Sequence, residues 1–429
     1  SSILRESQEG PMETFLQENS NFSMEAFVRE KVDFSVNAFA EASISQDELI
    51  AYGSVISMAV FPIIVGSYRS LSTMMDKKGQ RKKDNGGMET MSSQDAYMFP
   101  FIGSAVLFGL YLVFKFFSKE YVNMLLGAYF LFLGVAACTT TLAPVMTSFL
   151  PKSSQQKNYS IQFTIPVWKR ECDWQFTQVD LVSFLVSLVL GCWYITTKHW
   201  IANNFLGLAF SVQGITLLSL GSVQVGCILL WGLFVYDIFW VFGTDVMVTV
   251  ATSFEAPIKL KVPKNILESF FEGNPLQFSM LGLGDIVIPG IFVALLLRYD
   301  FWKQQGKTGW QARYFNVCAT AYTLGLLTTI TVMHVFKAAQ PALLYLVPFC
   351  TGSALLLAAV RGEFRDLLSY SEADESAEDE DAPPEKALEE GEEAPEQKAN
   401  TSETKSKKKT STTATSSVTT RRRSARLSK

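Results

Sequence analysis

Two acidic residues lie inside apolar stretches of the sequence, where their chemistry would be unusual. Asp237 falls in the run G-L-F-V-Y-D-I-F-W-V-F, and Asp285 falls in the run M-L-G-L-G-D-I-V-I-P-G. Placing an Asp side chain in hydrocarbon costs at least about 2.5 kcal/mol, so each of these residues needs a functional reason. Asp180 and Asp245 need none, because they fall at the ends of apolar stretches, where water reaches them.

A pair of carboxyl groups in a poorly solvated site can hydrolyse a peptide bond. The two groups cannot both ionise readily, so one keeps its proton and the pair titrates as a unit. The ionised member takes a proton from a bound water, and the protonated member hydrogen-bonds the scissile carbonyl. This chemistry uses neither a metal ion nor another cofactor, and we expect none. The sequence leaves open which Asp holds the proton.

The residues beside Asp285 suit such a site. Gly282 and Gly284 remove side chains just before it, so that a substrate backbone can approach closely. Pro289 has no N–H to donate to the carbonyl of residue 285, which loosens that turn. Ordinary helix-packing glycines and a helix kink are the alternative interpretation. Tyr236 is either an interfacial aromatic residue or a hydroxyl near the carboxyl pair.

A third short motif, Q-P-A-L, contains Pro341, Ala342 and Leu343 and opens the last apolar stretch. Proline is common in the first turn of a helix, so physical reasoning alone gives this motif little functional weight.

Apolar stretches that could cross a bilayer must position these residues. The chain has 429 residues, of which 48% are hydrophobic, and its polar residues are concentrated at both ends. A helix needs about 20 apolar residues to span about 30 Å of hydrocarbon. Hydrophobicity averaged in a sliding window along the sequence predicts nine spans. They are 49–68, 97–114, 122–143, 179–197, 201–219, 222–243, 278–297, 314–334 and 341–360. We therefore expect an all-α membrane protein, a polytopic bundle of nine transmembrane helices with the active site between the sixth and seventh. The fifth span, which contains Asn203 and Asn204, is the weakest.

The predicted spans place the two carboxyl groups at one depth. The sixth span ends near Gly243, about 9 Å of helix rise beyond Asp237. The seventh begins near Phe278, about 10 Å before Asp285. The two spans are antiparallel and share one connecting loop, so both distances are measured from the same face. The carboxyl groups should therefore be able to meet.

Charge in the loops predicts the orientation of the chain. With the N-terminus outside, the inner loops hold fourteen Lys and Arg residues against seven in the outer loops. We expect a polar lumenal segment at 1–48, a protease domain at 49–370, and a disordered cytosolic tail at 371–429 that is first acidic and then basic. Asn21 heads a sequon and is a glycosylation candidate on the lumenal side.

The motifs and their order resemble a known group of enzymes. Tyr236-Asp237, Gly282-Leu283-Gly284-Asp285 and Pro341-Ala342-Leu343 look like the Y-D, G-x-G-D and P-A-L signatures of the aspartyl intramembrane proteases, presenilin and signal peptide peptidase. The sequence around these motifs resembles the signal peptide peptidase family over about residues 49–370, for example in F-W-V-F-G-T-D-V-M-V-T-V-A and S-F-E-A-P-I-K-L. Presenilin is similar only in the motifs, and its long cleaved cytosolic loop is missing here. The outside placement of the 244–277 loop also matches the signal peptide peptidase family, whose topology is inverted relative to presenilin.

The resemblance implies catalytic roles for Asp237 and Asp285, and a Pro341-Ala342-Leu343 segment that packs against the active site and shapes it. It implies membrane-spanning peptide substrates in the lipid bilayer, notably signal peptides and type II segments, and residence in the endoplasmic reticulum membrane. Animal members of the reticulum type end in a di-lysine signal, whereas this sequence ends in R-L-S-K, so reticulum residence follows from overall likeness alone. Nucleic acid is not expected as a partner, and self-association into a homo-oligomer stays open.

Three other functions compete. An ion- or proton-coupled transporter also uses paired membrane carboxyl groups and broken helices, but no internal repeat is evident. A zinc protease is disfavoured because H-E-x-x-H does not occur, and a serine dyad is disfavoured because the only histidines are His199 and His334. An inactive scaffold that binds helices without cutting them stays open, although both carboxyl groups are intact.

Overall fold

The computed structural model describes residues 45–75, 88–149, 158–165, 170–244, 246–265, 269, 275–304, 312–336 and 340–372. Asn21 and nearly all of the predicted charged tail lie outside these residues. The predicted division into 1–48, 49–370 and 371–429 therefore stays a prediction.

Long helices make up most of the described chain, and each overlaps one predicted span. They are α3 (Gln46–Met74), α4 (Ser93–Phe116), α5 (Lys119–Phe149), α7 (Gln178–Thr197), α8 (Trp200–Leu217), α9 (Val223–Phe242), α12 (Gly284–Lys303), α13 (Arg313–Phe336) and α14 (Leu343–Arg361). Two shorter helices are α10 (Val246–Ser253) and α15 (Phe364–Ser369). Seven of the long helices are long and apolar enough to cross a bilayer. The chain is a mostly helical, polytopic membrane protein.

The two long helices outside those seven, α8 and α12, carry several polar and charged side chains. Asn203 and Asn204 lie in α8, the span that the sequence marks as weakest. Asp285, Arg298 and Asp300 lie in α12. Polar groups in a membrane-spanning helix need partners inside the protein, and both helices are extensively buried.

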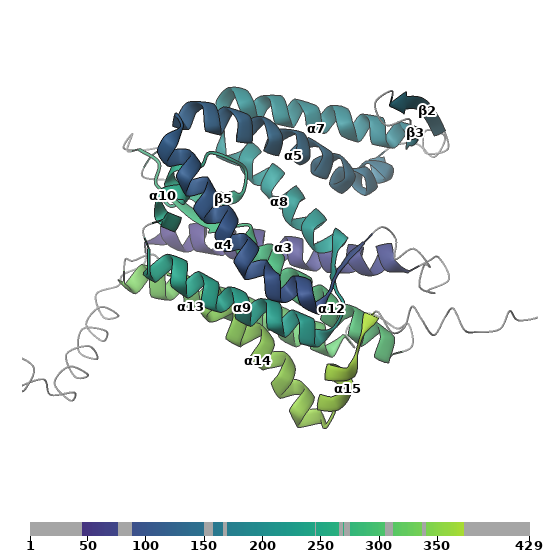
Figure 1. Cartoon of the computed structure of the whole chain (residues 1–429), viewed down its shortest axis with the longest axis vertical. Coiled ribbons are helices and arrows are strands. Elements are labelled where there is room, and N and C mark those ends of the chain that lie inside the picture. Colours follow the sequence, from purple (N-terminus) through teal and green to yellow (C-terminus); the bar gives the residue numbers. More distant parts are fainter. Residues whose placement is uncertain are drawn as a thin grey trace, which may run out of the picture. The chain divides into compact units, whose positions relative to one another are not determined.

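Helix α12 lies at the centre of the bundle. Every residue from Pro289 to Asp300 is buried, as expected for a helix surrounded on all sides. It packs against α3, α8, α9, α13 and α14, while α5 and α7 lie side by side along one edge of the bundle (Figure 1). Glycine allows close approach, because a Cβ built at Gly226 of α9 would lie 2.7 Å from the Phe292 ring. This packing holds the Asp285 end of α12 in a defined place.

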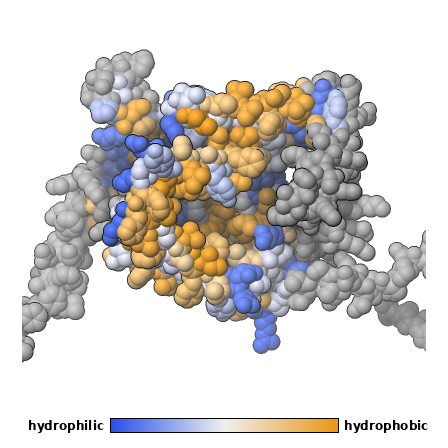
Figure 2. All heavy atoms as spheres, turned by 45° about the horizontal axis from the view of Figure 1, so that its top comes forward, coloured by the Kyte–Doolittle hydropathy of each residue, from blue (hydrophilic) through white to orange (hydrophobic). Residues whose placement is uncertain are grey.

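The outer surface of the described bundle is apolar. Large exposed side chains cluster on α4, α5 and α7, for example Phe101 (71% exposed) and Phe132 (74%). Figure 2 shows hydrophobic side chains over most of the visible described surface, with hydrophilic ones gathered toward its margins. In water such a surface would drive association, whereas in a bilayer it faces lipid.

In the described part of the chain, three short two-stranded sheets connect the helices, a feature that the predicted all-α class lacks. β1 (Glu89–Met91) pairs in parallel with β4 (Leu218–Leu220). β2 (Asn158–Ile165) pairs antiparallel with β3 (Arg170–Thr177). β5 (Lys259–Pro263) pairs antiparallel with β6 (Phe278–Gly282), and this hairpin leads into α12. The third sheet corrects the predicted seventh span, as described below.

The chain after α15 is tied back to the bundle by a segment that we call the strap, residues 370–372. Ser371 forms a bridge with Ser222, and the backbone N–H of Glu372 donates to the carbonyl of Gly221 at 2.8 Å. The Glu372 carboxylate then forms a buried ion pair with Arg298 of α12, with Oε1 at 2.6 Å from Nε. The strap therefore attaches to the end of α12 that is far from Asp285.

Candidate active site

Asp237 lies on α9, whose start is fixed by the Ser222 side chain accepting from the N–H of Val225 at 3.2 Å. The Asp237 side chain is buried, with 5% of its surface exposed. Its Oδ2 accepts a hydrogen bond from the backbone N–H of Leu343 at 3.0 Å. Leu343 is the first residue of α14, so the carboxyl group faces the positive end of a helix dipole.

Asp285 lies in the first turn of α12, and here the sequence prediction was wrong. Residues from Phe278 to Gly282 form strand β6 instead of the first turns of a helix, and α12 begins only at Gly284. The predicted helix rise of about 10 Å before Asp285 therefore does not exist. The backbone N–H of Leu283 extends the sheet by donating to the carbonyl of Ile258 at 3.0 Å.

An alternating pattern in the sequence could have identified this hairpin. In β5, Leu260 and Val262 are buried while Lys259 and Lys261 are half-buried, which is the period of two expected for a strand. In β6, Leu281 is buried and its neighbour Met280 is exposed. An apolarity window averages over this alternation and merges β6 with the helix that follows.

The two carboxyl groups nevertheless lie near each other. Asp285 is half-buried, and it lies close enough to Asp237 for their charges to interact. The Asp285 side chain also lies over Gly282, where an added Cβ would meet its Oδ2 at 3.3 Å. Around Gly284, which is exposed, there is open space. The two glycines thus differ, since Gly282 makes room for the carboxyl group itself and Gly284 leaves the approach to it open.

The asparagines of α8 hold the hairpin that leads to Asp285, a role that sequence reasoning missed. Asn204 pairs with both backbone groups of Lys261, accepting from its N–H at 2.8 Å and donating to its carbonyl at 2.7 Å. Asn203 donates to the carbonyl of Lys259 at 2.6 Å. The two side chains thereby act as a substitute strand on β5. The signal available in the sequence was two adjacent amides inside an apolar span.

The remaining predicted residues lie around this pair. Pro341 and Ala342 precede α14, with Ala342 already in helical conformation, and they deliver the Leu343 N–H to Asp237. The half-buried ring of Tyr236 packs toward α4, where a Cβ built at Gly103 would lie 3.7 Å from it. Among the described residues, no group of three or more His, Cys, Asp or Glu side chains is placed as a metal site requires.

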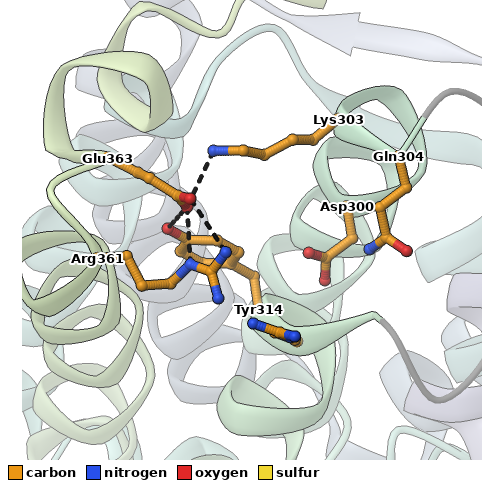
Figure 3. Close-up of a pocket in the computed structure, with 7 residues that line it drawn as sticks. Asp300, Lys303, Gln304, Tyr314, Arg361 and Glu363 are labelled. Atoms are coloured by element: carbon orange, nitrogen blue, oxygen red, sulfur yellow. Dashed lines mark hydrogen bonds and ion pairs between the residues drawn. The ribbon is translucent and has the colours of Figure 1, made fainter.

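A second charged cluster lies at the opposite end of α12, around a cavity of about 200 Å³ (Figure 3). Glu363 accepts from Arg361 at 3.0 Å and from Tyr314 at 2.9 Å, and it pairs with Lys303 at 2.9 Å. Hydrogen bonding by Arg361, and next by Lys303, lowers the pKa of Glu363 to about 2. This cluster begins at Asp300, about 22 Å of helix rise from Asp285. It ties helix ends together and takes no part in the candidate site.

Comparison with known proteins gives the family. A family model described as signal peptide peptidase matches residues 83–374, a range that contains both carboxyl groups and the Pro341–Leu343 motif. Human signal peptide peptidase is 49% identical over 328 residues, which cover 76% of this chain and 84% of that protein. The mouse protein of the same name is 50% identical over 329 residues, with the same two shares. Intramembrane protease 2 of Caenorhabditis elegans is 41% identical over 274 residues, 56% of this chain and 58% of that protein.

These relatives are peptidases and proteases, so they do not favour the transporter alternative, and they confirm the resemblance inferred from the motifs. Because the family model matches more than half of the residues, and the human and mouse proteins align with about three quarters of them, the chain belongs to the signal peptide peptidase family of intramembrane aspartic peptidases.

Proposed function

We propose that Asp237 and Asp285 are the catalytic pair of this peptidase and lie between the sixth and seventh of nine membrane spans. In this count α8 and α12 span the bilayer with the seven more apolar helices, and their polar groups face protein instead of lipid. The observation that carries the proposal is the meeting of two carboxyl groups from α9 and α12 inside a membrane protein. Neither group would be placed there for packing alone.

The contacts of the pair support different roles for its members. Asp237 accepts from the Leu343 N–H at the start of α14, and both the donor and the helix dipole stabilise a negative charge. We assign Asp237 as the ionised member, which takes a proton from the attacking water. Asp285 then holds the proton and donates it to the scissile carbonyl. Water adds to the carbonyl carbon, and the C–N bond breaks as a proton passes to the leaving amine.

The motif residues shape this site. Gly282 leaves room for the Asp285 carboxyl group, and Gly284 leaves the approach to it open. Pro341 and Ala342 set the start of α14, so that the Leu343 N–H points at Asp237. Tyr236 packs between α9 and α4, next to Asp237 in the chain.

The substrates follow from the family name and from the setting of the site. We propose that the chain cleaves membrane-spanning peptides, among them signal peptides and type II segments, in the endoplasmic reticulum membrane. The bias of Lys and Arg in the loops supports a lumenal N-terminus and a cytosolic C-terminus. With this orientation, substrates present a cytosolic N-terminus to the site.

The test is cleavage of a synthetic signal peptide by the purified protein, with product masses read directly. Asp237→Ala and Asp285→Ala should each lower the rate by more than about 100-fold while leaving expression and solubility in detergent unchanged. Asp180 lies in the first turn of α7, far in sequence from both Asp237 and Asp285. Asp180→Ala is therefore the matched carboxyl control and should cleave like the wild type. If either Asp237→Ala or Asp285→Ala keeps more than about a hundredth of the wild-type rate, the catalytic assignment is wrong.

A further inference from the structure

The backbone carbonyl of Asp285 lacks its usual helical donor. In α12 that donor would be the N–H of residue 289, which is Pro289 and has none. The helix is nevertheless continuous through this proline. An unpaired carbonyl inside a membrane protein is costly, because no water is at hand to replace the missing partner. Another group must therefore satisfy the carbonyl of the residue that we propose to be catalytic.

Tyr322 of α13 supplies the missing donor. Its hydroxyl donates to the carbonyl oxygen of Asp285 at 3.2 Å, and only 1% of the residue is exposed. Its neighbours one turn away on either side of the same helix, Cys318 and Leu326, are also buried. The contact joins residues that are 37 positions apart in the chain. It sets the position of the Asp285 backbone, from which the carboxyl group extends.

Helix α13 is in turn held closely against α14. A Cβ built at Gly325 would lie 3.2 Å from the Cβ of Phe349 and 3.4 Å from the Cα of Leu346, so the two backbones are in near contact there. The first residue of α14, Leu343, donates its N–H to Asp237. The α13–α14 pair thus contacts one carboxyl residue through Tyr322 and the other through Leu343. Both proposed catalytic residues are positioned against the same rigid pair of helices.

We infer that Tyr322 is a positioning residue of this peptidase, acting with Pro289 to fix Asp285 relative to Asp237. The inference rests on the proposed roles of the two aspartates. Pro289 frees the Asp285 carbonyl, and Tyr322 binds that carbonyl and ties it to α13. The hydroxyl does not touch the reacting atoms, so its loss should lower the catalytic rate without weakening substrate binding.

A double-mutant cycle tests this arrangement. Tyr322→Phe removes only the hydroxyl and should lower kcat about 5- to 10-fold, the rate equivalent of one net hydrogen bond, with KM changed less than about 2-fold. Pro289→Ala returns an N–H to the helix, so that the Asp285 carbonyl regains a donor. In the Pro289→Ala background, Tyr322→Phe should cost less than about 2-fold, because the hydroxyl is then redundant. Equal losses in the two backgrounds would show that Tyr322 does not act through this carbonyl.

Tyr314→Phe is the matched control, since it removes a hydroxyl from the same helix. That hydroxyl donates to Glu363 in the distant charged cluster, so kcat should stay at the wild-type value. Direct binding of a hydroxyl-bearing peptide isostere gives a second readout for variants that turn over too slowly, and its affinity should follow the same cycle. If Asp285→Ala cleaves like the wild type, the proposed function fails. If Asp285→Ala is inactive and Tyr322→Phe cleaves like the wild type, only the role of Tyr322 fails.

Discussion

Replacing Glu372 with Gln should strip Arg298 of its counter-charge and lower the thermal stability of the whole bundle. Both side chains are fully buried, and their ion pair is 2.6 Å long. Arg298 also donates to Ser70 of α3 at 2.6 Å, and Glu372 also accepts from Ser219 at 2.6 Å. One buried network therefore joins α3, β4, α12 and the strap.

The size of the effect follows from the burial. Removing one partner of a buried ion pair costs about 3–5 kcal/mol, because an uncompensated charge stays in the interior. For a large domain each kcal/mol lowers the midpoint by roughly 2–4 °C, so Glu372→Gln should lower it by about 6 °C or more. The midpoint is measured on detergent-solubilised protein by tryptophan fluorescence. Trp302 gives a nearby signal, since its ring centroid lies 5.4 Å from that of Tyr370 in the strap.

The same substitution at Glu363 is the matched control. The Glu363 side chain is 18% exposed and pairs with Lys303, which is 29% exposed. A partly exposed pair contributes about 0–1 kcal/mol, so Glu363→Gln should lower the midpoint by less than about 4 °C. Combining Arg298→Met with Glu372→Leu should recover much of the lost stability, since no charge is then left buried. If Glu372→Gln melts within about 1 °C of the wild type, or if the double apolar variant is no more stable than the single one, the argument from desolvation is refuted.

Two further predictions concern the hairpin in front of Asp285. Asn204→Leu should lower kcat by more than about 5-fold, because β5 loses a partner for two backbone groups. Asn316→Leu, at an exposed position of α13, serves as the control. The measurement is cleavage of the same signal peptide, and an unchanged rate for Asn204→Leu would contradict the positioning role. Gly282→Ala should lower kcat more than Gly284→Ala does. Only at Gly282 would an added Cβ press on the Asp285 carboxyl group, at 3.3 Å from its Oδ2. A larger loss for Gly284→Ala in the same assay would contradict this account.

The long helices were predictable because hydrocarbon thickness fixes their length. A span of about 20 apolar residues has few alternative structures in a bilayer, so the predicted ranges overlap all nine long helices. The predicted start of the seventh span failed for a related reason. The F-S-M-L-G segment that ends at Gly282 is apolar on average, yet it pairs with a strand outside its own window. Apolarity reports where a segment is buried and leaves open whether it is helix or strand there.

The contacts within the site could not be read from local sequence. Asp237 and Asp285 stood out because they are charged residues in apolar runs, but their partners did not. Leu343 contributes a backbone N–H, and Tyr322 contributes a hydroxyl from the middle of an apolar helix. Nothing in the residue type of a leucine or a span tyrosine reveals such a contact. The packing of α13 on α12, and of α14 on α9, brings these groups to the two aspartates.

The two helices that fall outside the apolar criterion carry or position one of the two carboxyl residues, Asp285. In α8, Asn203 and Asn204 lower the apolarity of the span and bind the backbone of β5. In α12, Asp285 provides a carboxyl group at one end and Arg298 anchors the strap toward the other. A polar group survives in hydrocarbon only if the protein satisfies it, so every such residue implies a specific internal partner. In this family member the weak spans therefore carry or hold Asp285, whereas Asp237 lies on α9, one of the apolar spans, and stands out only by its own charge.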